Sequence, residues 1–179
     1  MIKFLRVMRL DDSDEHVYPT AAQQGELAVT GSLLFSFAEE DPETWSGKRK
    51  QAFRTGFLGL DSFGWSTIVE IAEVPEAQFE HAVRMLAHHL VEHYGAPSLA
   101  EAMPYARQEA EYAAGLCEDP PGTLLMVERH ADDEGIHEAF RRVQPPALES
   151  TPTRPEKADW RGHDGEIRIW DMFPEDGGR

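Results

Sequence analysis

The stretch RTGFLGLDSFGWSTIVEI, residues 54–71, joins a loop rich in glycine and aromatic residues to an apolar strand. Glycines let the backbone approach a neighbour closely, and aromatic side chains offer large contact surfaces. This combination favours recognition over catalysis, so we predict that the loop binds a ligand or a partner protein. The predicted binding residues are Arg54, Phe57, Asp61, Phe63 and Trp65.

The strand that follows the loop predicts how its aromatic side chains are oriented. Successive side chains of a strand point to opposite faces. Trp65 is an even number of residues from Val69 and Ile71, so all three side chains should point to the same face. Trp65 should therefore point into the core, whereas Phe63 lies in the looser part of the loop and should face a groove or partner. A purely structural alternative stays open, in which these rings fill the core where a helix meets the strand.

The segments before the loop predict an antiparallel meander followed by a helix. Asp41-Pro42-Glu43 has the cap residue, the first-turn proline and the acidic residue typical of a helix start, and we expect that helix to continue to Phe53. A turn at Gln23-Gln24-Gly25 predicts a hairpin. The expected strands are residues 4–10, 16–18, 27–29 and 33–37, the last preceded by a bulge at Gly31.

The segments after the loop predict a strand, two long helices, a buried strand and a short helix. Ser98 and Glu101 form a capping box at the start of the second long helix, and Pro104 predicts a kink or a restart within it. Asp133 is expected to cap the short helix, in which Ile136 and Phe140 share a face. The expected ranges are a strand at 66–74, helices at 75–94 and 98–115, a strand at 123–127 and a helix at 133–143.

Together these elements predict one α+β domain over residues 1–143, with an antiparallel sheet covered on one face by helices in a two-layer arrangement. From Gln144 the composition changes to a proline-rich segment without apolar periodicity. We predict that residues 144–179 form a partly ordered C-terminal tail, with an edge strand at 166–170 as one way for it to dock.

Charge and cysteine content narrow the classes of partner and the compartment. Thirty-three acidic residues against seventeen basic ones give a formal net charge of −16, which repels nucleic acid and anionic membranes and leaves a protein partner. Lys3, Arg6 and Arg9 interrupt any signal-peptide core, and the single cysteine cannot form an internal disulfide. We therefore predict a cytoplasmic location, and the sequence leaves a homo-oligomer open.

One motif supports an alternative function. His89-Leu90-Val91-Glu92-His93 matches the H-x-x-E-H pattern of inverted zinc peptidases, in which two histidines hold the metal and the glutamate activates its water. Glu166 is a conceivable third ligand. Because an ordinary amphipathic helix already explains these residues, we predict no metal ligand, no cofactor and no catalytic residue, and keep a small metal-dependent hydrolase as the alternative.

Glu109 and Glu111 lie on different sides of a helix, and we expect both to face solvent.

Three segments resemble an uncharacterised family of small, acidic proteobacterial proteins: Lys3-Phe4-Leu5-Arg6 with Leu10-Asp11, the 54–67 loop, and Gly122-Thr123-Leu124 with Glu138-Ala139-Phe140-Arg141. The resemblance covers residues 1–143. It implies no catalytic residues, and it implies an association with the assembly of metallo-oxidoreductases. The leading hypothesis is therefore a non-enzymatic binding or accessory protein that docks a partner protein through the 54–67 loop or the tail.

Overall fold

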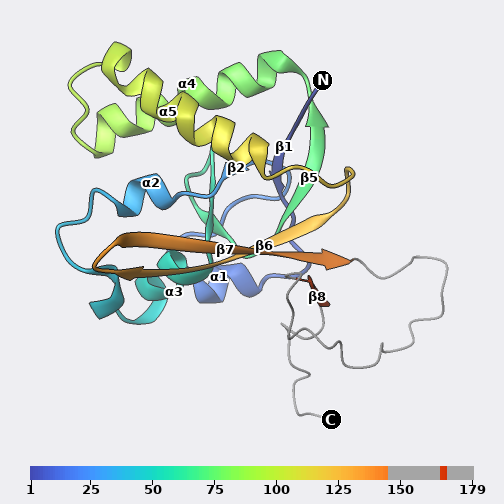
Figure 1. Ribbon diagram of the computed structural model, residues 1–179, viewed down its shortest axis with the longest axis horizontal. Coiled ribbons are helices and arrows are strands. Elements are labelled where there is room, and N and C mark those ends of the chain that lie inside the picture. The colour runs from blue at the N-terminus through green and yellow to red at the C-terminus, as the bar shows by residue number, and fades with distance from the viewer. Residues whose placement is uncertain (145–165, 169–179) are drawn as a thin grey trace, which may run out of the picture.

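The computed structural model describes residues 1–144 and 166–168, which fold around a curled sheet (Figure 1). The strand order is β4-β3-β2-β1-β5-β6-β7-β8; neighbours from β4 to β7 pair antiparallel, and β8 joins β7 in parallel. The strands are β1 (Ile2–Val7), β2 (Leu27–Val29), β3 (Phe57–Gly59), β4 (Trp65–Ser66), β5 (Val69–Val74), β6 (Leu124–Asp132), β7 (Gly135–Gln144) and β8 (Glu166–Arg168).

The helices gather at two ends of this sheet (Figure 1). The long helices α4 and α5 pack against each other and against β1, whereas α3 lies against β6. In the described part of the chain, no helix combines the length and the apolar character needed to cross a membrane. The helices are α1 (Ser13–Val17), α2 (Ser32–Phe35), the 3-10 helix η1 (Pro42–Thr44), α3 (Gly47–Thr55), α4 (Glu76–His93) and α5 (Leu99–Gly115).

The core lies between β1, β5 and the α4–α5 pair. Phe4 of β1 is fully buried and meets Phe79 of α4 edge to face, with ring centroids 5.4 Å apart. Helix α5 buries Ala102, Ala106 and Ala110, whose small side chains let its backbone come close to the sheet. The predicted combination of helices with an antiparallel sheet is confirmed, while the two-layer arrangement stays a prediction.

Several predicted elements are confirmed by the local structure. The strands at 4–10 and 66–74 correspond to β1 and β5, and the two long helices correspond to α4 and α5. The Ser98 hydroxyl accepts a hydrogen bond from the Glu101 amide at 3.2 Å, as the capping box requires. Helix α5 continues through Pro104 without a break, so the predicted restart is wrong.

Two predicted strands of the meander are helices instead. Residues 16–18 belong in part to α1, which is fixed by the buried Asp14 carboxylate accepting a 2.7 Å hydrogen bond from the Thr67 hydroxyl. Residues 33–37 overlap α2, which begins directly after Gly31 in a left-handed conformation (φ 87°), so this glycine is a helix cap and not a bulge. Short apolar runs do not distinguish a strand from a buried helical turn, and tertiary contacts decide between them.

The predicted helix at 42–53 is interrupted, and the predicted helix at 133–143 is wrong. Trp45 and Ser46 are extended, which separates η1 from α3. Residues 135–144 form β7, paired with β6 from Leu124↔Val143 to Asp132↔Gly135. The four-residue spacing of Ile136 and Phe140 fits one face of a helix and also one face of a strand, and the long-range pairing selects the strand.

The position of the Trp65 ring accounts for glycine at positions 31 and 56. The ring stacks on Phe35, with centroids 5.0 Å apart. A Cβ atom placed on Gly31 would lie 2.7 Å from this ring, and one placed on Gly56 would lie 2.8 Å from it. The indole therefore occupies space that any larger residue at either position would need, and it ties α2 to the start of β3.

We expect Trp65→Ala to lower the free energy of unfolding by about 3–5 kcal/mol, because it leaves a cavity beside Phe35 and both glycines. Phe63→Ala removes one ring stacked on His89 and should cost less than about 1.5 kcal/mol. Urea unfolding of both variants measures the difference. Equal losses would show that Trp65 is not the ring that completes the core.

Candidate functional site

A cleft of about 830 Å³ opens between three parts of the fold. One wall is the segment from α2 to η1, the second is α5, and the third is the turn between β6 and β7. Among the described residues that line it, no side chain is basic and five are carboxylates. These five are Glu39, Glu40, Asp41, Glu109 and Asp132.

Helix α5 presents one continuous stripe to the cleft. Tyr105, Gln108, Glu109 and Tyr112 all line it, and their spacing of three and four residues places them on one helical face. The tyrosines stand at the surface, with 58% of Tyr105 and 45% of Tyr112 exposed. The stripe thus combines two accessible aromatic rings with a buried carboxyl between them.

The wall formed by η1 is fixed to the sheet through one glutamate. The Asp41 carboxylate caps η1 by accepting from the Glu43 amide at 2.9 Å. The Glu43 carboxylate in turn accepts from Lys50 of α3 at 3.0 Å and from the Ala131 amide of β6 at 2.8 Å. The backbone H-bond from Ala131 is the main cause that lowers the pKa of Glu43, so this carboxylate stays ionised.

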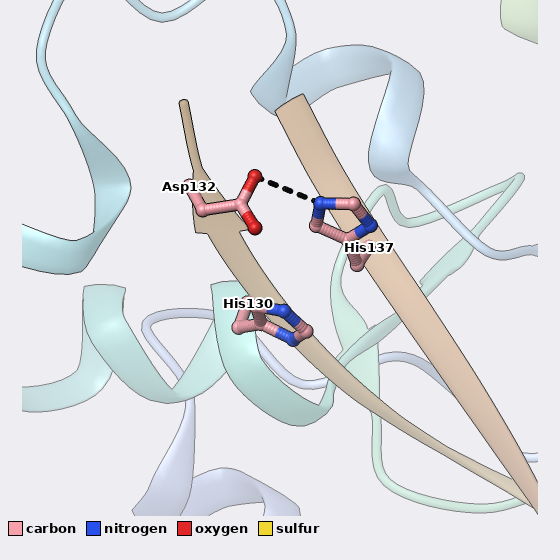
Figure 2. A group of neighbouring side chains, drawn as sticks. All are labelled: His130, Asp132 and His137. Carbon is pink, nitrogen blue, oxygen red and sulfur yellow. Dashed lines mark hydrogen bonds and ion pairs between the residues drawn. The ribbon is translucent and has the colours of Figure 1, made fainter. Parts of the chain in front are cut away.

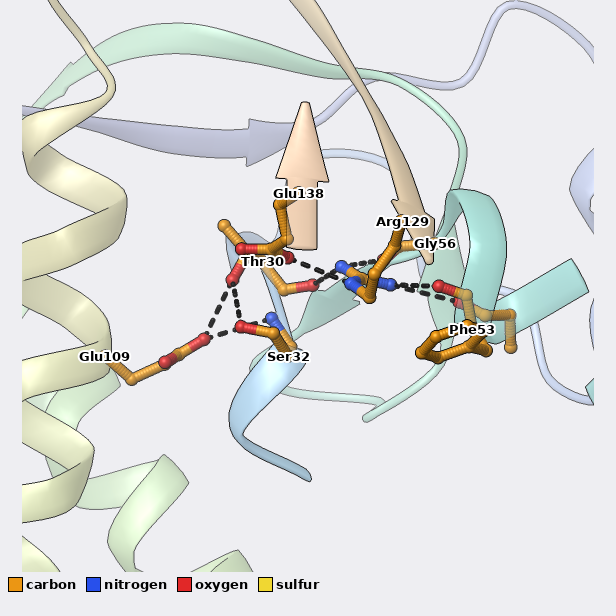
Figure 3. A network of polar contacts seen from close by, with 9 residues as sticks. Thr30, Ser32, Phe53, Gly56, Glu109, Arg129 and Glu138 are labelled. Atoms are coloured by element: carbon orange, nitrogen blue, oxygen red, sulfur yellow. Dashed lines mark hydrogen bonds and ion pairs between the residues drawn. The ribbon is translucent and has the colours of Figure 1, made fainter. Parts of the chain in front are cut away.

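The buried guanidinium of Arg129 belongs to a polar network that reaches Glu109 of the cleft through Thr30 (Figure 3). It is fully buried, and its Nε donates to the Glu138 carboxylate at 2.9 Å. Its two terminal nitrogens donate to backbone carbonyls, among them those of Thr30 at 2.7 Å, Gly56 at 3.1 Å and Phe53. One side chain of β6 thereby holds β7, the end of β2 and the end of α3 together.

Glu109 is the buried acid of the cleft. Its carboxylate accepts from the Thr30 hydroxyl at 2.9 Å and from the Gly31 amide at 3.2 Å. Burial raises the pKa of Glu109 above its usual value, and these hydrogen bonds oppose the rise. Burial likewise raises the pKa of Tyr112 to about 12, helped by the charge of Glu138, to which its hydroxyl donates.

The predicted binding loop lies apart from this cleft, and none of its five predicted residues lines it. Arg54 and Asp61 are exposed, whereas Phe57 is fully buried in β3 and has no surface to offer a ligand. The loop is held from beneath by the Glu26 carboxylate, which accepts from the amides of Asp61 and Ser62 at 2.8 and 2.9 Å. Binding through the loop stays a prediction.

Phe63 and Trp65 are both partly buried against the core. Phe63 has a left-handed backbone (φ 55°), which is unusual for a bulky residue, and its ring lies flat on His89 at 3.8 Å between centroids. Burial lowers the pKa of His89 to about 4, so this imidazole is neutral near pH 7. Phe63 therefore covers a neutral histidine of α4.

The H-x-x-E-H helix does not gather three ligands among the described residues. The rings of His89 and His93 lie 4.9 Å apart at the C-terminal end of α4, and β8, which contains Glu166, lies at the opposite end of the fold (Figure 1). Within the described chain, three potential ligand atoms come together only at His130, Asp132 and His137. Hydrolysis by α4 stays an untested alternative.

The sequence analysis does not identify Glu109 or Arg129 as residues of the site, although the spacing around each of them indicates that it faces inward. Glu109 was expected to face solvent, and that expectation is wrong, since only 9% of the residue is exposed. The Tyr105, Gln108, Glu109, Tyr112 spacing marks it as part of one stripe. Arg129 shares its parity with the buried Leu125 and Val127 in β6, which marks it as an inward-facing charge.

A sequence profile described as a family of unknown function, DUF6505, matches residues 1–152. The chain belongs to this family. The DUF6505 match spans all the residues that line the cleft, and it confirms the predicted membership of an uncharacterised family; proteobacterial origin stays a prediction. No curated protein and no solved structure matches the chain.

Ionisation of Glu109 should make the stability of the fold depend on pH. Because its pKa is raised in the folded state, the folded chain keeps this proton above the usual value of 4.5, whereas the unfolded chain releases it. The contribution of Glu109 to the free energy of unfolding is therefore present at low pH and falls as the pH rises through the folded-state pKa.

Glu109→Gln keeps an oxygen that accepts from Thr30 and Gly31 but removes the titration. The free energy of unfolding of the variant, relative to the natural chain, should grow as the pH rises above 4.5. Urea unfolding of both proteins at several pH values measures this difference. A difference that stays constant with pH would show that Glu109 titrates normally.

Proposed function

We propose that the chain is a non-enzymatic binding protein whose cleft takes a basic segment of a partner protein. The observation that carries the proposal is the lining of the cleft, which among the described residues contains five carboxylates and two exposed tyrosines but no Lys or Arg. Arg49, from outside the lining, lies 3.8 Å from the carboxylate of Glu40. Such a surface attracts lysine and arginine side chains over a long range and repels acidic ones. The formal net charge of −16 adds to this attraction.

The tyrosines supply contacts that a purely acidic surface lacks. Tyr105 and Tyr112 are accessible on the same face of α5, and a guanidinium or ammonium group stacked on such a ring is attracted by its π electrons. Tyrosine is also enriched among the residues that dominate binding at protein interfaces. The two rings, with Glu109 between them, favour a segment that carries more than one cationic side chain.

A neighbouring groove extends the surface with an apolar end. This groove, of about 520 Å³, shares Tyr105 with the cleft and is lined further by Phe37, Leu90 and Tyr94. Phe37 and Tyr94 are 47% and 38% exposed, with ring centroids 5.9 Å apart. The combined shape suits an extended segment with basic residues followed by a large apolar side chain.

Charge favours a basic segment of another protein in the cleft over the chain's own C-terminal tail and over a second copy of the chain. Residues 145–179 of the chain itself carry eight acidic and five basic residues, so this tail gains little from an acidic cleft. A second copy of the chain carries the same net charge of −16 and is repelled. A basic segment of a different protein is the occupant that the charges favour.

The proposal keeps the predicted class of function and moves it to another surface. A binding or accessory role is predicted for the 54–67 loop or the tail, and the cleft offers another surface with a defined charge. An accessory role in the assembly of metallo-oxidoreductases would be one biological use of such binding. The proposal requires neither catalysis nor a cofactor.

The probe for this cleft is a short fluorescein-labelled peptide of alternating arginine and glycine that ends in leucine, and fluorescence anisotropy measures its binding. Glu39→Gln/Glu40→Gln removes two exposed carboxylates of the lining and should weaken binding about tenfold at low ionic strength. Added salt should weaken binding to the natural chain more than binding to this variant, because exposed charges are screened.

The matched control is Glu73→Gln/Glu111→Gln, which removes two exposed carboxylates outside the cleft. Binding by this control should stay close to that of the natural chain. An equal loss in both double variants would mean that the overall charge of the protein, and not the cleft, attracts the peptide. Equal binding of a peptide with glutamate in place of arginine would contradict the proposal as well.

Tyr105→Ala should weaken binding of the same peptide by about tenfold or more, because it removes the ring shared by the cleft and the apolar groove. Tyr105→Phe keeps the ring and should bind nearly as well as the natural chain. If both variants bind as tightly as the natural chain, the aromatic part of the proposed surface is not used.

A further inference from the structure

Three potential metal ligands stand on one face of the β6–β7 hairpin (Figure 2). His130 and Asp132 belong to β6 and His137 belongs to β7, and one ligand atom of each lies within 4.8 Å of the other two. His130 and Asp132 are exposed and His137 is half-buried. The cluster is separate from the H-x-x-E-H helix α4.

The hairpin register explains why these side chains meet. His130 is the direct cross-strand partner of His137, and their rings stack with centroids 4.9 Å apart. Asp132 lies two residues further along β6 and therefore on the same face as His130. Its own partner is Gly135, which has no side chain, so the Asp132 carboxylate has room to lean diagonally toward His137.

The turn of the hairpin fixes the carboxylate. Asp132 Oδ1 accepts a 2.8 Å hydrogen bond from the backbone amide of Glu134 and lies 2.8 Å from Nε2 of His137. A backbone donor that orients a carboxylate is the kind of support that metal ligands commonly have. Asp132 also lines the cleft, so the cluster borders the acidic surface.

We propose that His130, Asp132 and His137 bind a divalent transition-metal ion, with Zn²⁺ as the representative. Two imidazoles and one carboxylate are a ligand set that suits Zn²⁺, Ni²⁺, Cu²⁺ or Fe²⁺, whereas Ca²⁺ and Mg²⁺ prefer oxygen ligands throughout. Zn²⁺ requires nitrogen and oxygen ligands about 2.0–2.2 Å from the ion. The ligand atoms lie within 4.8 Å of one another, and rotation of the side chains has to bring them to such distances from a common ion.

Three protein ligands leave the fourth position of a tetrahedral ion open. Because two of the ligands are exposed, this position is accessible from solvent, and a water molecule or a donor group of a bound partner completes the shell. The site rests on the hairpin geometry and does not depend on whether the cleft binds a basic segment.

Titration of the full chain with Zn²⁺ against a chromophoric chelator tests the site. The natural chain should bind one equivalent that is lost or weakened at least about tenfold in His130→Ala and in His137→Ala. Asp132→Asn keeps the contact with the Glu134 amide but removes the charge, and it should also weaken binding. Co²⁺ in place of Zn²⁺ should give visible absorption bands that disappear in the same variants.

The control is His88→Ala/His93→Ala, which removes two histidines of α4 and should bind Zn²⁺ like the natural chain. Thermal unfolding verifies that every variant is folded. The proposal is wrong if the natural chain binds no equivalent of Zn²⁺, if the hairpin variants bind it normally, or if binding is lost in the α4 variant instead. The last outcome would support the hydrolase alternative.

Discussion

The fold depends on one buried positive charge, the guanidinium of Arg129. A buried charge is costly unless every donor is paired, and this one donates to the Glu138 carboxylate and to carbonyls at the ends of β2 and α3. The last carbonyls of a helix lack intrahelical partners and carry partial negative charge, so the end of α3 is a favourable place for a cation. Because β6 and β2 are separated in the sheet by β1 and β5, Arg129 bridges strands that could not meet in a flat sheet.

The curl of the sheet also shapes the surface of the protein. It brings the β6–β7 turn opposite α2 and α5, and the space left between them is the acidic cleft. Arg129 and Glu138 compensate each other in the interior, whereas four of the five acids that line the cleft, all except Glu109, are exposed. Glu109 connects the two regions, since Thr30 donates its hydroxyl to Glu109 and offers its carbonyl to Arg129. The same polar network therefore contains Arg129, which holds the sheet together, and Glu109, which lines the proposed binding cleft.

The sequence predicts the parts of this architecture that depend on local pattern. The apolar stripe of α4, the N-cap at Ser98 and the alternation in β5 are each specified within a few residues, and the structure contains all three. The parts that depend on distant contacts are not predictable in this way. Residues 136–143 carry a spacing that fits helix or strand, and α1 is fixed by a hydrogen bond that the Thr67 hydroxyl donates to the Asp14 carboxylate.

The candidate cleft escaped prediction for the same reason. Its walls come from segments far apart in the chain, and the carboxylates of Glu39, Glu109 and Asp132 meet only after the sheet has curled. The composition of the 54–67 loop predicts a binding site, yet Phe57 and Trp65 mainly pack against the core. The rest of the predicted tail, residues 145–165 and 169–179, lies outside the described part of the chain.

Urea unfolding of Arg129→Met is the most direct test of this account, with Arg141→Met as the matched control on the same hairpin. Arg141 pairs with Glu128 at 3.1 Å near the surface, and its loss should cost less than about 1 kcal/mol. Loss of Arg129 leaves the buried Glu138 without its cationic partner and several buried carbonyls without a donor, and it should cost roughly 3–5 kcal/mol. If both variants lose the same small free energy of unfolding, Arg129 does not hold the curl of the sheet.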